Sequence, residues 1–99
     1  MEVDWNQFNQ LRELDPTGAL EREMLEIFLK DTKEDLQNLG NDPKAYAHRI
    51  KGRAAQLGFP QLSTSAHELQ QDPQNPELFR ALQSLIQEAL MHISQQLLR

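Results

Sequence analysis

The chain has 99 residues, of which 38% are hydrophobic and 25% charged, with a formal net charge of −5 and no cysteine. This length suits a single domain, expected over residues 1–99, with a modest core and without disulfide, thiolate or cysteine-based metal chemistry. The start, Met1 to Asp4, lacks the basic residues and apolar run of a secretory signal, and no stretch approaches the ~18 apolar residues of a membrane span. We therefore expect a small cytoplasmic protein with no membrane partner.

Breaks that contain proline or glycine divide the chain into five segments of helical periodicity. They fall at residues 15–18, 40–43, 58–60 and 72–76. Between them apolar residues recur at steps of three and four, as on one face of a helix. The first segment is short: Trp5, Phe8, Leu11 and Leu14 mark its apolar face, and Asp4 and Gln7 have the spacing of a capping box.

The other four segments each carry one apolar stripe. The expected core positions are Leu25, Phe28, Leu29, Thr32, Leu36 and Leu39 in the second, Ala47, Ile50, Ala54 and Leu57 in the third, Leu62, Ala66 and Leu69 in the fourth, and Leu78, Leu82, Leu85, Ile86, Ala89, Ile93 and Leu97 in the fifth. The acidic residues of the second segment, including Asp31, Glu34 and Asp35, are interpreted as its solvated face. Loops of about three to five residues make sequential helices antiparallel. The sequence therefore predicts an all-α fold, an antiparallel up-and-down four-helix bundle with a short extra helix at the N-terminus.

The third segment exposes a histidine beside two small residues. At ~100° per residue, the apolar stripe that contains Ala47 and Ile50 faces the core, whereas His48 lies well round toward solvent. Gly52 and Ala55 share the ridge of His48. A glycine inside an exposed helix costs about 0.8 to 1 kcal/mol relative to alanine, and nothing in the expected packing requires one here. The pattern indicates a smooth surface on which another molecule approaches the imidazole closely.

Basic residues concentrate around the same histidine. Lys44, Arg49, Lys51 and Arg53 are four of the ten lysines and arginines, in a chain of net charge −5. No acidic residue lies among them in the sequence. They predict a local positive field, and therefore an anion beside His48.

The next turn places a glutamine opposite this histidine. The chain turns near Gly58 and Phe59, and His48 precedes the turn by about as many residues as Gln70 follows it. We expect the amide of Gln70 to hydrogen-bond one ring nitrogen of His48 and so to determine which nitrogen is left free. His67 lies three residues before Gln70 and shares its face, where we expect it to support the site rather than to bind a ligand.

One stretch of the third segment resembles the signature of histidine-containing phosphotransfer (HPt) domains; it reads AHRIKGRAAQLGF over residues 47–59. The shared features are the histidine, an aliphatic residue two positions on, the Lys-Gly pair, and Leu-Gly five and six residues after that glycine. The chain is also similar to the phosphotransfer domain of chemotaxis kinases, which has a histidine and a Glu or Gln where His67 and Gln70 stand. The likeness extends to the flanking helices, residues 24–39 and 62–70.

The resemblance implies a phosphotransfer role in a two-component phosphorelay. His48 would accept a phosphoryl group from an aspartyl phosphate and pass it to another aspartate, while Lys51 would contact the phosphoryl oxygens and Gln70 would orient the ring. The residues expected to meet the partner are Gly52, Ala55, Lys44, Arg49 and Arg53. Arg53 stands where the family usually has a small residue, which implies a different partner preference.

The partners implied by the resemblance are a response-regulator receiver domain and a sensor histidine kinase of the hybrid type, with this chain acting as a monomer. The receiver would bring Mg²⁺ and the aspartates that hold it, so no cofactor is expected on this chain. No ATP-binding domain is present, so we expect a phosphotransfer intermediate rather than an enzyme, without kinase activity of its own. Three scattered histidines without HExxH spacing predict no metal site.

Two other functions fit parts of the sequence. An adaptor would dock a receiver or kinase through the same helical face without being phosphorylated, and the sequence does not separate it from a relay protein. Residues 54–65 also have the turn length and glycine position of a helix-turn-helix motif. Its second helix, residues 61–71, contains no lysine or arginine, and an acidic chain opposes phosphate contacts, so no nucleic-acid partner is expected.

Overall fold

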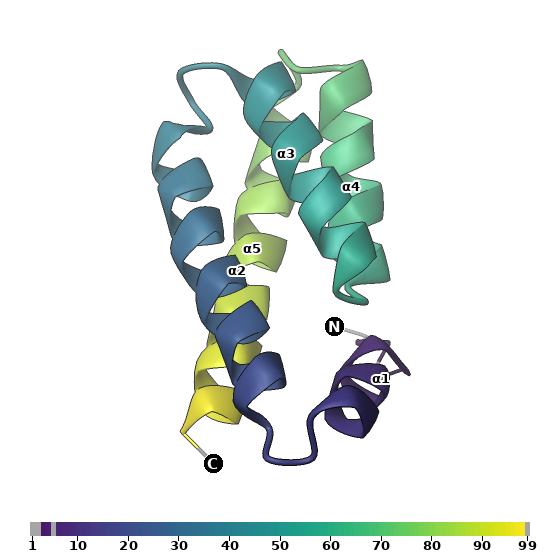
Figure 1. Ribbon diagram of the computed structural model, residues 1–99. Helices are drawn as coiled ribbons and strands as arrows, with labels where there is room; N and C mark the ends of the chain where they lie inside the picture. Colours follow the sequence, from purple (N-terminus) through teal and green to yellow (C-terminus); the bar gives the residue numbers. More distant parts are fainter. Residues whose placement is uncertain (1–2, 5, 99) are drawn as a thin grey trace.

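The computed structural model, shown in Figure 1, describes residues 3–4 and 6–98, apart from the side chain of Gln7. Its helices are α1 (Asn6–Leu14), α2 (Ala19–Asn38), α3 (Pro43–Gln56), α4 (Pro60–Gln71) and α5 (Pro76–Leu97). The expected all-helical fold is confirmed for this part of the chain, which contains no strand. The core role of Trp5 and the capping box with Gln7 concern side chains outside the described part. None of the described helices is long and apolar enough to cross a membrane.

Proline and side-chain caps explain where the later helices begin. Helices α3, α4 and α5 each start with a proline, whose missing N–H would be unpaired in the first turn in any case. The Asp42 carboxylate accepts a hydrogen bond from the amide of Ala45 at 3.2 Å. The Asn75 side chain accepts from the amides of Glu77 and Leu78 at 3.0 and 3.2 Å. These bonds satisfy donors that the helices themselves leave free.

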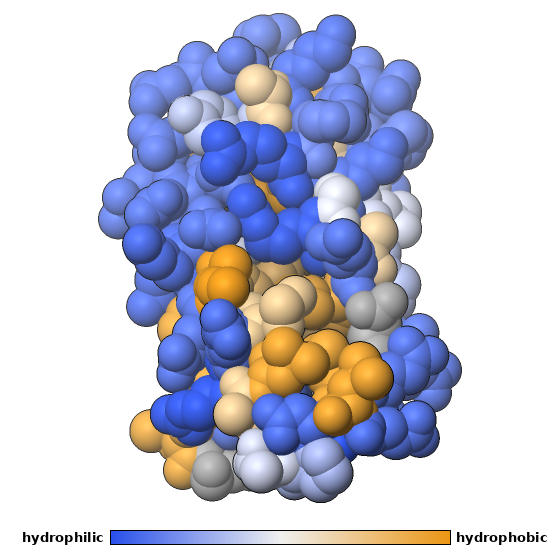
Figure 2. All heavy atoms as spheres, in the orientation of Figure 1, coloured by the Kyte–Doolittle hydropathy of each residue, from blue (hydrophilic) through white to orange (hydrophobic). Residues whose placement is uncertain are grey.

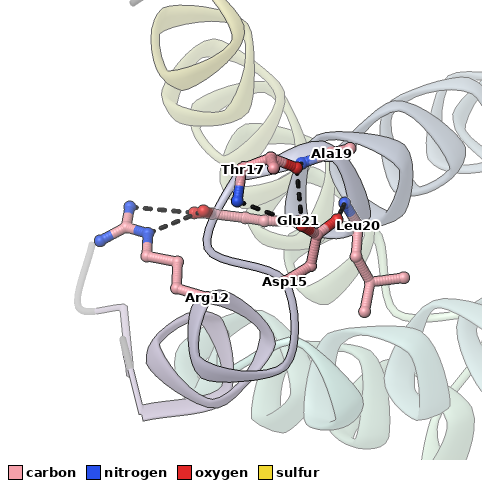
Figure 3. Close-up of polar contacts among 6 residues, drawn as sticks. All are labelled: Arg12, Asp15, Thr17, Ala19, Leu20 and Glu21. Atoms are coloured by element: carbon pink, nitrogen blue, oxygen red, sulfur yellow. Dashed lines mark hydrogen bonds and ion pairs between the residues drawn. The ribbon is translucent and has the colours of Figure 1, made fainter.

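Helix α2 begins instead at a side-chain network in the α1–α2 loop, drawn in Figure 3. The Asp15 carboxylate accepts from the hydroxyl of Thr17 at 2.6 Å and from the amide of Leu20 at 3.1 Å. These bonds and a third from the Thr17 amide lower the pKa of Asp15, because they favour its charged form. Arg12 pairs with Glu21 through both carboxylate oxygens, at 2.7 and 3.0 Å, and this contact raises the pKa of Arg12. The network ties α1 to the first turn of α2.

The apolar stripes meet in one core. The residues that are almost fully buried include Phe8, Leu25, Phe28, Leu39, Ala47, Ile50, Ala54, Leu57, Phe59, Leu62, Ala66, Leu69, Leu82, Ile86, Ala89 and Ile93. The rings of Phe28 and Phe59 stack with their centroids 5.3 Å apart. The predicted stripes of the four later helices are confirmed, with Leu29, Leu36, Leu78, Leu85 and Leu97 packed at the border of the core. Leu14, expected on the apolar face of the first helix, is instead 77% exposed at its last turn.

One prediction about the surface of α2 is wrong. Asp35 is not solvated: only 2% of its surface is exposed, and it lies among the buried residues of α2 with Thr32. Its carboxylate is compensated by Arg53, whose Nη1 donates to it at 2.8 Å. A buried carboxylate requires such a partner, and the partner comes from α3 rather than from α2 itself.

Helix lengths explain the place of α1. Helices α2 and α5 have 20 and 22 residues, whereas α3 and α4 have 14 and 12. In Figure 1 α3 and α4 end above the lower parts of α2 and α5, and α1 lies below them. Phe8 is 1% exposed and brings α1 into the core. Figure 2 shows the result, with apolar side chains gathered on the lower half of this face and polar ones on the upper half.

The chain just before α1 also contacts the α3–α4 turn. The amide of Asp4 donates to the carbonyl of Gly58 at 2.6 Å. Gly58 has φ +80°, and a Cβ atom there would overlap the carbonyl oxygen of Asp4. Both the backbone conformation and the close approach require glycine at this position.

Candidate functional site

The candidate site is the seam between α3 and α4, which pack together more extensively than any other pair of helices. His48 is exposed, and its Nδ1 lies 3.1 Å from Nε2 of Gln70. One turn further along α3, Nζ of Lys51 lies 3.0 Å from Nδ1 of His67. The contact expected between His48 and Gln70 is therefore present, and a second one lies beside it. These four residues, two from each helix, are called the quartet below.

The turn at Gly58 aligns the quartet. The carbonyl of Ala54 accepts a hydrogen bond from the amide of Phe59 at 2.9 Å, which closes the turn and starts α4 directly against α3. The hydroxyl of Ser63 donates to the carbonyl of Lys51 at 3.3 Å and holds the two helices in register. Each residue of α3 on this seam thus faces a fixed residue of α4.

The two imidazoles of the quartet have different neighbours. The ammonium of Lys51 only donates hydrogen bonds, so Nδ1 of His67 accepts one and carries no proton. His48 faces an amide, which has both a donor and an acceptor end. The acceptor end, Oε1 of Gln70, is buried and has no hydrogen-bond partner within the described part of the chain. The amide of Gln70 therefore has an oxygen available for a ring N–H.

The surface beside His48 is open, as expected. A Cβ atom at Gly52 would meet no atom within 4 Å, so no packing contact accounts for the glycine. Ala55 and Lys44 are also exposed. Gly52 has no side chain and Ala55 only a methyl group, so the α3 surface next to the imidazole has room for another molecule.

The structure does not bring Arg53 to this surface. Its side chain is 17% exposed and turns toward α2, where it donates to Thr32 and Asp35 at 3.2 and 2.8 Å. Arg49 is 57% exposed, but its Nε lies 3.4 Å from Asp35 as well. The carboxylate of Asp35 thus offsets part of the positive field that the sequence predicts around His48. The basic run along α3 gives no sign of this acid, because Asp35 belongs to α2.

No group of three or more histidine, aspartate or glutamate side chains that could hold a metal ion occurs in the part of the chain that the structure describes. The quartet consists of two imidazoles, one amide and one ammonium group. Such groups provide one nucleophilic nitrogen, a side chain that sets its tautomer, and a cation beside it. This combination suits transfer of an anionic group to and from a ring nitrogen.

The fold and the site together define an all-helical domain that exposes two histidines, His48 and His67, on a pair of packed helices. The family model of the Hpt domain matches residues 23–95. The chain therefore belongs to the Hpt domain family, which links it to histidine phosphotransfer in two-component phosphorelays and to their kinases and response regulators. Neither the curated proteins nor the solved structures gave a match. The matched residues include the whole quartet and leave out α1.

Proposed function

We propose that this chain relays a phosphoryl group between aspartates of response-regulator receiver domains, or from a hybrid sensor kinase, through a phosphohistidine at His48. The observation that carries the proposal is the exposed imidazole whose Nδ1 faces Gln70 while the surface at Gly52 is open. Helices α2 to α5 form, in this proposal, the antiparallel up-and-down four-helix bundle of a single domain over residues 1–99. The chain acts as a cytoplasmic monomer and as a phosphoryl carrier rather than an enzyme.

The chemistry requires a particular tautomer of His48. Nδ1 lies against Gln70, so the nitrogen that attacks is Nε2, and the ring proton then sits on Nδ1. With the amide of Gln70 turned so that Oε1 faces His48, this oxygen accepts a hydrogen bond from Nδ1–H. Nε2 of the neutral ring then attacks phosphorus, the N–P bond forms, and the bond from phosphorus to the receiver's aspartate oxygen breaks. The aspartate leaves as a carboxylate, and the positive charge on the ring is shared with Gln70 through the Nδ1–H bond.

Charge stabilisation in the proposed transfer comes from both molecules. Phosphoryl transfer depends mainly on positioning and on stabilising the charge of the phosphoryl oxygens. Lys51 lies one turn from His48 and supplies a cation, once its ammonium turns from His67 to the phosphoryl group. The receiver supplies Mg²⁺ and the carboxylates that bind it, and this chain binds no cofactor of its own.

The test is phosphoryl transfer from a phosphorylated receiver domain in the presence of Mg²⁺ to three proteins: the wild type, His48→Gln and the control His92→Gln. His92 is a half-buried histidine on α5, outside the quartet. We expect label that is lost in acid and kept in base on the wild type and on His92→Gln, and none on His48→Gln. Melting temperatures should be nearly equal for His48→Gln and wild type, since the replaced side chain is exposed.

Two results would contradict the relay. Label on His48→Gln at the level of the wild type would remove the histidine from the mechanism. Binding of several receivers without any transferred label would instead favour an adaptor that docks receivers through the same face of α3.

A further inference from the structure

Asp35 is the one buried carboxylate in the part of the chain that the structure describes, and the proposed transfer does not use it. It lies between α2 and α3, and each of its oxygens faces an arginine of α3. Oδ2 accepts a hydrogen bond from Nη1 of Arg53 at 2.8 Å, and Oδ1 lies 3.4 Å from Nε of Arg49. One buried acid therefore holds two of the four basic residues that surround His48 in the sequence.

The two arginines are held unequally. Arg53 is 17% exposed, makes the shorter contact with Asp35, and donates to the hydroxyl of Thr32 at 3.2 Å. Arg49 is 57% exposed and makes the longer contact. Its guanidinium carbon lies 5.7 Å from the centre of the Tyr46 ring. Arg53 is thus fixed inside the α2–α3 interface, whereas Arg49 rests on its edge.

This difference determines the energetic cost of moving Arg49 away from Asp35. Removing the only partner of a buried charge is costly because the charge stays uncompensated. Asp35 keeps Arg53 when Arg49 moves away, so this cost does not arise. What is lost is one longer ion pair whose arginine is 57% exposed, and water around that arginine screens the contact, so it contributes little. Arg49 directly follows His48 in the chain, and its guanidinium suits a carboxylate because it offers two parallel donors.

We infer that Arg49 is a releasable cation that pairs with a carboxylate of the docked receiver, and that Asp35 is a positioning residue that holds Arg49 at the edge of the site until docking. This inference rests on the proposed function, since the partner is a receiver domain. The two arginines, neighbours in the sequence, thus have different roles. Arg49 binds the partner, and Arg53 anchors α3 to α2.

The experiment measures the affinity of the full chain for a receiver domain with Mg²⁺ at low and at high salt. The variants are Arg49→Gln, Asp35→Asn, the double variant, and Arg80→Gln as a control with an exposed arginine on α5. At low salt Arg49→Gln should bind about two- to fivefold more weakly, as expected for one exposed ion pair. This difference should shrink at high salt because salt screens exposed charges. Arg80→Gln should bind like the wild type.

Asp35→Asn tests the restraint itself. Without the carboxylate Arg49 gives up no ion pair on docking, so this variant should bind at least as tightly as the wild type at low salt and show a steeper salt dependence. In the double variant this gain should disappear. A readout that needs no partner is the NMR signal of the Arg49 Nε–H, which should move in Asp35→Asn. If Asp35→Asn does not fold, Arg49→Lys replaces it and should bind between the wild type and Arg49→Gln, since lysine keeps the charge but not the paired donors.

The outcomes separate the two proposals. Equal binding by Arg49→Gln and the wild type, at a wild-type affinity that is measurable, would overturn this inference and leave the relay intact. A gain in Asp35→Asn that persists in the double variant would also overturn it, because the gain would then not pass through Arg49. Absence of any receiver binding by the wild type would overturn both.

Discussion

The two sides of α3 treat polar side chains in opposite ways. On the side toward α2, the buried Asp35 and the half-buried Arg53 are joined at 2.8 Å, with Thr32 beside them. On the side toward α4, His48 is exposed and contacts Gln70 through one ring nitrogen at 3.1 Å. On the α2 side the polar groups bind one another, whereas on the α4 side the second ring nitrogen of His48 is left free to react. A single helix thus separates anchoring from chemistry by the direction in which its side chains point.

The difference has a thermodynamic meaning. Removing one partner of a buried ion pair costs several kcal/mol, because the remaining charge is left in a poorly solvated place. Substitution of an exposed side chain usually changes stability by less than about 0.5 kcal/mol. Changes on the α2 side should therefore act mainly on the free energy of unfolding, and changes on the α4 side or on the open surface mainly on docking and transfer. Four substitutions test this separation.

The largest effect is expected for Gly52→Gln on the open surface. Its side chain meets no atom of the protein within 4 Å of the Cβ and so extends into the space that a receiver needs. Docking and transfer should be lost, while stability rises by about 0.5 to 1 kcal/mol because glycine is a poor helix former. Receiver titrations and urea unfolding measure the two effects. Gly52→Ala is the matched control, which should gain stability and keep most binding; undiminished binding by Gly52→Gln would refute the argument from close approach.

Arg53→Gln addresses the anchoring side. It leaves the buried Asp35 without its closest partner, and the free energy of unfolding should fall by about 3 kcal/mol. Transfer per folded molecule should stay near the wild-type rate. Arg49→Gln is the control, since Arg49 is largely exposed and its longer, solvent-screened pair with the same carboxylate contributes about 1 kcal/mol or less. Equal losses of stability in urea for the two variants would mean that the arginines are held equally.

Lys51→Ala addresses the α4 side. Loss of the ammonium should slow transfer about tenfold, less than the hundredfold or more for a buried oxyanion donor, because this site is open to water. The free energy of unfolding should be nearly unchanged. Rapid-quench measurement of phosphohistidine formation provides the rate, and His67→Gln, which keeps an acceptor for the ammonium, is the control. A rate equal to that of the wild type would take Lys51 out of the transfer step.

Asp15 provides the smallest effect and a contrast with Asp35, since its carboxylate is held by hydrogen bonds at an exposed helix start. Bonds from Thr17 and Leu20 lower its pKa in the folded protein. The ionised Asp15 therefore stabilises the folded protein. This contribution is complete above the pKa of an aspartate in the unfolded chain, about 4, and is lost as the pH falls through the lower pKa of the folded protein. Melting temperature against pH should therefore fall less steeply at the acid end for Asp15→Asn than for the wild type. Coincident acid slopes would show that Asp15 does not contribute.

Much of the site follows from counting along the chain. His48 and Gln70 each lie eleven residues from Phe59, and Lys51 and His67 each lie eight from it. Residues equally distant from a tight turn between packed helices face each other, which predicts the first contact. The same count would have found the second, and Lys51 would then have been placed against His67 as well as beside the phosphoryl group. Apolar periodicity likewise predicts the buried face of each helix.

The anchoring side could not be read in this way. A charged residue on a helix is normally solvated, so the sequence pattern predicts Asp35 on the outer face of α2. Its position seven residues after Phe28 and three after Thr32 does place it on the buried stripe, and that was the available signal. Its partners are on another helix, and they depend on how α2 and α3 are rotated against each other. Periodicity within one helix contains no information about that rotation.

The bond between Asp4 and Gly58 bears on the order in which the protein folds. It joins residues 54 positions apart, whereas the two contacts of the quartet span 16 and 22 positions. Contacts between near neighbours in the sequence close smaller loops and form sooner on average. The α3–α4 hairpin, with its reactive histidine, can thus assemble before the N-terminal helix docks beneath it. In the reverse direction α1 opens first, and its amides should exchange with solvent faster than those of α3.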